Sequence, residues 1–243
     1  MKSLKAGVLA LALSAVVSAQ QPSYTPPHLV RGDLPSLPPP TVVGGGEVLI
    51  EATVDPNGAL TRPVVLRSTP PYTNIVLDAI TRWRFMPAQI NTNGKEAPVN
   101  GSVLIAAIYR PPTLMNGPTL GERPRDLSTA SSSSPYPVST VAPAFPPQAR
   151  SGSVLLYEVP LDENGQVVNI RGVGADPGFD AAAKDAIIQW KFRGASFGGH
   201  SVPSTAYVIF GFQPPVVGVP INAAPGTSPV PPPATQIPPP PGN

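Results

Sequence analysis

The chain has no cysteine, and this absence excludes several kinds of structure and chemistry at once. Without thiols, the protein cannot build disulfide staples, cysteine-ligated zinc sites or cysteine nucleophiles. Histidine is almost absent as well, since His28 and His200 are the only two. We expect both to be solvated loop residues, because His28 lies in a proline-rich stretch and His200 in a glycine-rich one. The sequence therefore predicts no enzyme, no cofactor and no metal site.

Net charge is also nearly absent, because 16 Lys and Arg stand against 14 Asp and Glu. Two of the basic residues, Lys2 and Lys5, precede an apolar run that ends in small residues at Ala19, a pattern typical of a secretory signal peptide over residues 1–19. Its removal would leave 14 charges of each sign, so no nucleic-acid partner is predicted. We expect a periplasmic protein secreted across the inner membrane. An uncleaved N-terminal anchor is the alternative.

Proline, by contrast, is abundant, with 37 in 243 residues. The prolines gather at the two ends and between two regions of regular hydrophobic pattern. Such composition favours polyproline II and flexible connections over packed core. We expect residues 20–40 to be a spacer, residues 113–134 a Pro/Ser-rich linker, and residues 216–243 a disordered tail.

Between these stretches one unit occurs twice, at a constant offset of 107 positions. Over residues 45–88 the two copies share thirteen identical positions without a gap. In the first copy these are Gly45, Leu49, Glu51, Asp55, Asn57, Gly58, Pro70, Asp78, Ala79, Ile80, Trp83, Phe85 and Ala88. Solenoid repeats are shorter and more numerous. The offset therefore indicates two tandem domains, which we place at residues 41–112 and 135–215.

Each unit shows the pattern of two strands, a helix and a further strand. Apolar residues alternate over residues 47–54, Asp55 to Gly58 has turn chemistry, and residues 60–66 supply a returning strand. We expect a polar loop over residues 89–98, then a last strand over residues 102–109. The equivalent last strand of the second unit is predicted over residues 205–212.

The helix carries Val76, Ile80 and Trp83 on one stripe, and Pro87 stops it. The predicted fold class is therefore α+β, with two small ββαβ domains. Each would be a three-stranded antiparallel sheet with one helix packed on it, and Pro/Ser-rich linkers would join them. Because no periodic segment connects the units, we expect them to fold independently.

Two features have a chemical and a structural interpretation. Asp55 and Asp162 could suggest acid or metal chemistry, but each is followed by an Asn-Gly pair, which makes them turn formers first. Trp83 and Phe85 could bind a ligand, but an aromatic pair where a helix hands over to a strand more often packs in a core.

In combination, these motifs resemble the TonB C-terminal domain, here in two copies over about residues 45–109 and 144–212. The shared features are the strand opened by glycine, the Asp-x-Asn-Gly turn, and the helix that ends in Trp, a basic residue and Phe. Residues 144–152 are similar to the family's Tyr-Pro lead-in, with Phe145 in place of Tyr. Between Pro38 and Gly46 the first unit has no aromatic counterpart.

The resemblance implies a periplasmic binding protein that pairs a sheet edge with a short segment of a TonB-dependent outer-membrane transporter. In the family this couples the transporter to inner-membrane motor proteins. Because the amino terminus has the pattern of a cleavable signal, the binding role is the primary expectation, and a part in energy-coupled transport stays open. The alternative is a structural envelope or cell-wall scaffold protein without energy transduction.

The same resemblance implies which residues bind the partner. In the family the last strand of the domain offers its open edge, so Ile209→Pro is expected to abolish binding, whereas Ile209→Thr is expected to leave most of it. The candidate partner-binding residues come from both last strands and from the lead-in of the second unit. They are Phe145, Pro146, Tyr207, Val208, Ile209, Phe210, Phe212, Val103, Ile105 and Ala107.

Overall fold

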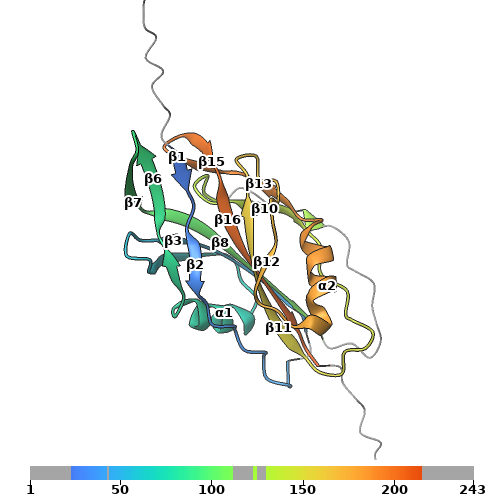
Figure 1. The fold of residues 1–243 in the computed structure, drawn as a ribbon. Coiled ribbons are helices and arrows are strands. Elements are labelled where there is room, and N and C mark those ends of the chain that lie inside the picture. The colour runs from blue at the N-terminus through green and yellow to red at the C-terminus, as the bar shows by residue number, and fades with distance from the viewer. Residues whose placement is uncertain (1–22, 43, 112–122, 125–129, 215–243) are drawn as a thin grey trace, which may run out of the picture.

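A computed structural model describes residues 23–42, 44–111, 123–124 and 130–214 (Figure 1), which form two helices and sixteen strands. The predicted mixed α+β class is confirmed. In the first half the elements are β1 (Ser23–Thr25), β2 (His28–Arg31), β3 (Gly46–Val54), β4 (Leu60–Arg67), α1 (Tyr72–Ile80), β5 (Arg84–Met86), β6 (Ala88–Thr92), β7 (Lys95–Val99) and β8 (Gly101–Arg110). In the second half they are β9 (Arg123–Pro124), β10 (Tyr136–Thr140), β11 (Ser153–Leu161), β12 (Arg171–Gly174), α2 (Pro177–Ile187), β13 (Lys191–Arg193), β14 (Ala195–Phe197), β15 (His200–Val202) and β16 (Ser204–Phe212).

The two repeats share one sheet of six strands, in the order β12-β11-β16-β8-β3-β4. Within each repeat the three strands are antiparallel, as predicted. The last strands β8 and β16 then pair with each other in parallel, which joins the two halves. The prediction of two separate three-stranded sheets is therefore wrong. In two separate sheets, β8 and β16 would each leave a row of backbone N–H and C=O groups unpaired along one edge. In this chain each of the two strands pairs those groups with the other.

The two helices lie on opposite faces of this sheet (Figure 1). Strands β8 and β16 are equivalent and run parallel side by side, so an approximate twofold axis along the strand direction relates the two repeats. A rotation about this axis exchanges the two faces of the sheet, which is why the helix of one repeat lies on the face opposite to that of the other. On one face α1 packs over a core that includes Trp83 and, from the second repeat, Leu156, Tyr207 and Ile209. On the other face α2 packs over a core that includes Leu104 from the first repeat. Each core thus takes residues from both repeats, so the predicted independent domains are not what the chain forms.

The segment before each repeat is part of the body. Strand β2 pairs with β5, and β10 pairs with β13 in the same way. The indole N–H of Trp83 donates to the Asp33 carbonyl at 2.9 Å, and that of Trp190 donates to the Val141 carbonyl at 2.8 Å. We call residues 23–42 the N-terminal strap. The prediction of a spacer over residues 20–40 is therefore wrong for the part that the structure describes.

The strap reaches the second repeat. A side chain at Gly174 of β12 would meet Leu34, and one at Gly152 would meet Leu37. The strap ends in a turn in which the Val42 N–H donates to the Pro39 carbonyl at 2.9 Å. The second repeat has the equivalent turn between residues 146 and 149. The first repeat therefore keeps the path of the lead-in without its aromatic residue.

The predicted tight turns are present. The Asp55 carboxylate accepts hydrogen bonds from the backbone of Asn57 and Ala59, both at 2.9 Å, and Asp162 makes the equivalent bonds. At Gly58 the backbone has φ +78°, and a Cβ there would collide with the Phe85 carbonyl oxygen. The interpretation of both aspartates as turn formers is confirmed.

Residues 89–98 do not form the expected polar loop, because β6 and β7 pair there as a hairpin. Asn93 and Gly94 both have positive φ, as a type I′ turn requires. The predicted signal peptide and the predicted tail over residues 216–243 lie outside the described residues, as does most of the predicted linker. Neither α1 nor α2 is long and apolar enough to cross a membrane.

Candidate functional site

The predicted partner-binding strands lie in the middle of the sheet. Ile209 of β16 lies beside Ala107 of β8, and each strand also pairs with a strand of its own repeat on its other side. All the candidate residues on the two strands are fully buried. The prediction of an open edge at residues 103–109 and 207–212 is therefore wrong, and a peptide could pair there only after the two repeats separate.

The predicted lead-in contributes packing. The Phe145 ring contacts the rings of Phe179 and Phe212 at centroid distances of 5.9 and 5.7 Å, and Phe145 is buried. Pro146, which follows it, accepts a backbone hydrogen bond from Ala149 in a turn. These residues close one end of a core, and neither faces an open strand.

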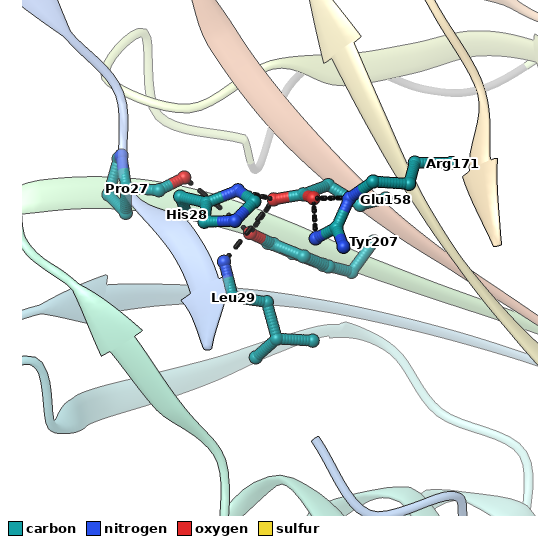
Figure 2. Close-up of polar contacts among 6 residues, drawn as sticks. All are labelled: Pro27, His28, Leu29, Glu158, Arg171 and Tyr207. Carbon is teal, nitrogen blue, oxygen red and sulfur yellow. Dashed lines mark hydrogen bonds and ion pairs between the residues drawn. The ribbon is translucent and has the colours of Figure 1, made fainter. Parts of the chain in front are cut away.

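The most concentrated polar chemistry in the described residues surrounds Glu158 of β11 (Figure 2). Arg171 of β12 and Tyr207 of β16 are the cross-strand partners of Glu158 on either side, and strand partners share a face. Arg171 Nε donates to Oε2 at 2.7 Å, and its Nη2 donates to the same oxygen. The Tyr207 hydroxyl donates to Oε1 at 2.9 Å. Three neighbouring strands thus converge on one carboxylate.

The N-terminal strap completes this cluster from above the sheet. His28 Nδ1 lies 2.8 Å from Oε1, and the backbone N–H of Leu29 donates to the same oxygen at 3.2 Å. His28 is half exposed, whereas the Glu158 side chain is 97% buried. His28 is exposed as expected, but the expectation of a loop residue is wrong, because it lies on β2 and faces a buried acid.

Burial sets the electrostatics of the cluster. Removal from water raises the pKa of the Tyr207 hydroxyl well above its usual value, and the adjacent Glu158 carboxylate raises it further. Tyr207 is therefore a stable proton donor. The charge of Glu158 is balanced by Arg171, and both carboxylate oxygens accept hydrogen bonds, which is how proteins make a buried charge tolerable.

The repeat supplies a matched site at Glu51, which is the equivalent of Glu158. Its carboxylate accepts from the backbone N–H of Ser131 at 3.3 Å and from the hydroxyls of Ser131 and Ser133. These serines precede the second repeat, within the segment predicted as a flexible linker. Each glutamate therefore holds the segment that leads into the other repeat. Glu51 is more exposed than Glu158. Its partner on the neighbouring strand is Val64, whereas the partner of Glu158 at the equivalent position is Arg171.

The cluster around Glu158 is suited to attaching the N-terminal strap to the sheet, since groups of the strap and of the sheet bind both carboxylate oxygens. The carboxylate has neither a free oxygen nor a share in the two surface depressions described next. Among the residues that the structure describes, no group of three or more His, Asp or Glu could hold a metal ion. The geometry assigns Glu158 to the attachment of the strap.

A depression of about 370 Å³ lies at the end of β8, where Arg110 and Arg67 are among the lining residues. Arg110 is buried, its Nη1 donates to the Pro143 carbonyl, and burial lowers its pKa. Arg67 lies 3.1 Å from Glu47. Arg110 Nε is buried without a hydrogen-bond partner, and water does not reach it. The wall of the depression therefore carries two arginines and the acid Glu47, and the free N–H does not open into it.

A second depression of about 620 Å³ lies where the repeats meet, between β1, β6 and the β14–β15 hairpin. Tyr24 and Phe197 line it, and their rings stack at 5.0 Å with an angle of 26°. His200 lies on its wall, exposed on β15 as expected, although in a strand.

Comparison of the chain with models of protein families, with curated proteins and with solved structures finds no match. The resemblance to the TonB C-terminal domain thus rests on the sequence motifs.

Proposed function

We propose that the chain is a periplasmic TonB-like binding protein that pairs the outer edge of β4 with an extended segment of an outer-membrane transporter. The motif resemblance suggests the class of partner. The observation that carries the proposal is the place of β4: it ends the sheet, and among residues 23–42, 44–111, 123–124 and 130–214 no strand pairs with its outer side. An unpaired edge is a template for an added strand.

Side chains on β4 give this edge apolar contacts. Val64 and Val65 are 54% and 38% exposed, and they lie on opposite faces of the strand, so each face presents an apolar side chain beside the edge. Pro63 lacks a donor and Arg62 has φ +48°, so the segment suited to pairing is Val64 to Arg67. Backbone hydrogen bonds would give affinity, and the two valines would give selectivity.

The opposite edge of the sheet is less suitable. Strand β12 has four residues, and two of them, Gly172 and Gly174, carry no side chain. The strap residue Leu34 also lies against Gly174. A partner strand would therefore find a short edge with part of one face covered.

We also propose that each half derives from one ββαβ unit of the TonB-like kind. Both halves share the Asp-x-Asn-Gly turn and the helix, and in both halves the last strand pairs with the first strand of the unit. These common features support the proposal. In this chain the two units use their last strands to bind each other, so the edge that the family offers to its partner is occupied.

A titration with synthetic peptides tests the proposed function. The probes are amino-terminal segments of outer-membrane transporters from the same genome, added to the full chain. Val64→Lys is expected to weaken binding at least about tenfold, because a lysine on an edge strand opposes strand addition. Val168→Lys is the matched control at a 67% exposed valine beside the other edge and is expected to bind like the parent. Equal binding by both variants would overturn the assignment to β4.

A scaffold role in the cell envelope is the second candidate, and the mutual pairing of β8 and β16 favours it, since it occupies the edges used for coupling in the family. The proposed scaffold would sediment with purified cell-wall material and bind none of the transporter peptides. Inner-membrane motor proteins enter as partners only if residues 1–19 remain as an anchor.

A further inference from the structure

The aromatic depression at the junction of the repeats has the composition of a site for proline-rich chain. Beside the stacked rings of Tyr24 and Phe197, it is lined by Ile90, Val202 and Pro203. Grooves lined by aromatic rings recognise polyproline II segments, because proline rings pack on flat aromatic faces and the helix is already rigid before binding. The lining of this depression therefore suits such a ligand.

The depression also offers a hydrogen-bond donor. The Tyr24 hydroxyl has no hydrogen-bond partner among the described residues, and burial raises its pKa to about 12, so it keeps its proton. A polyproline II helix has no internal hydrogen bonds, so its carbonyl oxygens are available to a donor of this kind. The serine hydroxyl of Ser201 lies on the same wall.

The chain already packs one of its proline-rich segments onto its own surface. In the N-terminal strap, Pro27, Pro35 and Pro38 are buried. Pro27 lies so close to Gly101 that a side chain at Gly101 would meet it. Proline-rich sequence in this protein is therefore a packing element as well as a connection.

We propose that this depression is a binding site for polyproline II chain, and that its occupant is the chain's own tail within residues 229–241. That stretch contains eight prolines, and residues 215–243 contain no Asp, Glu, Lys or Arg. An uncharged ligand suits a groove that has rings and aliphatic side chains beside one acidic residue, Glu163, and no Lys or Arg.

The tail is long enough to reach the site. The depression adjoins Pro203 at the start of β16, and the described chain ends just beyond the other end of that strand. Nine residues of strand span roughly 30 Å. Residues 215–229 span up to roughly 45 Å as polyproline II. A tether of this kind gives an effective concentration on the order of 1 mM, so even a weak groove would be substantially occupied.

A spin label on the tail of the full chain tests this proposal. Because the chain has no cysteine, Ser228→Cys gives one attachment point for a nitroxide. The proposal expects the strongest paramagnetic broadening at the backbone amides of Gly198, Gly199 and Ser201, and little at those of β4 and α2. Raising the salt concentration is expected to leave the pattern unchanged, since no charge pair is involved.

Two variants separate docking from folding. Phe197→Ala removes one ring of the stack and is expected to abolish the selective broadening. Replacing all eight prolines of residues 229–241 together by serine leaves every described residue intact and is also expected to abolish it. Uniform broadening over the surface, or selective broadening that survives the tail replacement, would overturn the proposal.

Discussion

Trp83 of the first repeat packs edge-on against Tyr207 of the second, with ring centroids 5.6 Å apart and an angle of 69°. Both side chains are fully buried in one core. The hydroxyl of the same Tyr207 donates to Glu158, which holds the N-terminal strap. The core of the first repeat therefore depends on residues of the second.

This dependence predicts that damage to one repeat spreads to the other. Trp83→Ala should lower the free energy of unfolding by about 3–5 kcal/mol, because it leaves a large cavity in the shared core. The variant retains Trp190 as its only tryptophan, so the fluorescence reports on the second repeat. The midpoint of urea unfolding measured this way is expected to fall. An unchanged Trp190 transition would show that the repeats unfold separately.

The two equivalent glutamates are expected to differ in their effect on stability. Glu158→Gln removes the charge that balances Arg171 and puts an amide NH2 where one acceptor oxygen faces buried donors, so it should cost about 1–3 kcal/mol in the free energy of unfolding. Glu51→Gln, the matched control, should cost less than about 1 kcal/mol, because its partners are exposed serine groups. Urea unfolding of both variants measures the difference, and equal losses would contradict the assignment of Glu158 as the main attachment of the strap.

The raised pKa of Tyr207 predicts that the protein loses stability in alkali. Its pKa is raised in the folded state, whereas in the unfolded chain it titrates near 10.0. Its contribution is therefore fully present below about pH 10 and declines as the pH rises toward the folded pKa, because the folded state keeps a proton that the unfolded state loses. Between about pH 10 and pH 11 the unfolding free energy of the parent should fall with pH more steeply than that of Tyr207→Phe. The two slopes should differ by up to about 1.4 kcal/mol per pH unit. Identical slopes for the variant and the parent would contradict this.

The mature amino terminus tests the predicted secretion. We expect cleavage after Ala19, so the intact mass of the periplasmic protein should lack residues 1–19. A mass that includes these residues would restore the membrane-anchored alternative, and with it a role for inner-membrane motor proteins.

The sequence was sufficient to predict most elements of each repeat. The alternation in β3, the Asp-Asn-Gly turn and the helical stripe at Val76, Ile80 and Trp83 all report local structure, and local structure follows from local pattern. The hairpin at residues 89–98 is not predicted from the sequence, although its Asn93–Gly94 pair is a turn signal, because β7 is mostly exposed and contains a proline and two charged residues.

The joining of the repeats could have been inferred from β8 and β16. Both are apolar along nearly their whole length, which is typical of strands buried on both faces and unlike a strand at a half-exposed edge. The family resemblance drew the interpretation toward an edge instead. The roles of His28 and Arg171 had no such signal, because they depend on how the strap and β12 meet Glu158 in space.

Hydrogen exchange of the β8 and β16 amides tests the central claim, that the two repeats form one body through these strands. Successive amides of a strand point to opposite sides, so a central strand protects all of them, whereas an edge strand leaves every second one open to solvent. We predict that the amides over residues 104–110 and 206–212 exchange slowly at odd and even positions alike, at the rate of global unfolding. Fast exchange at alternate positions of either strand would contradict the account.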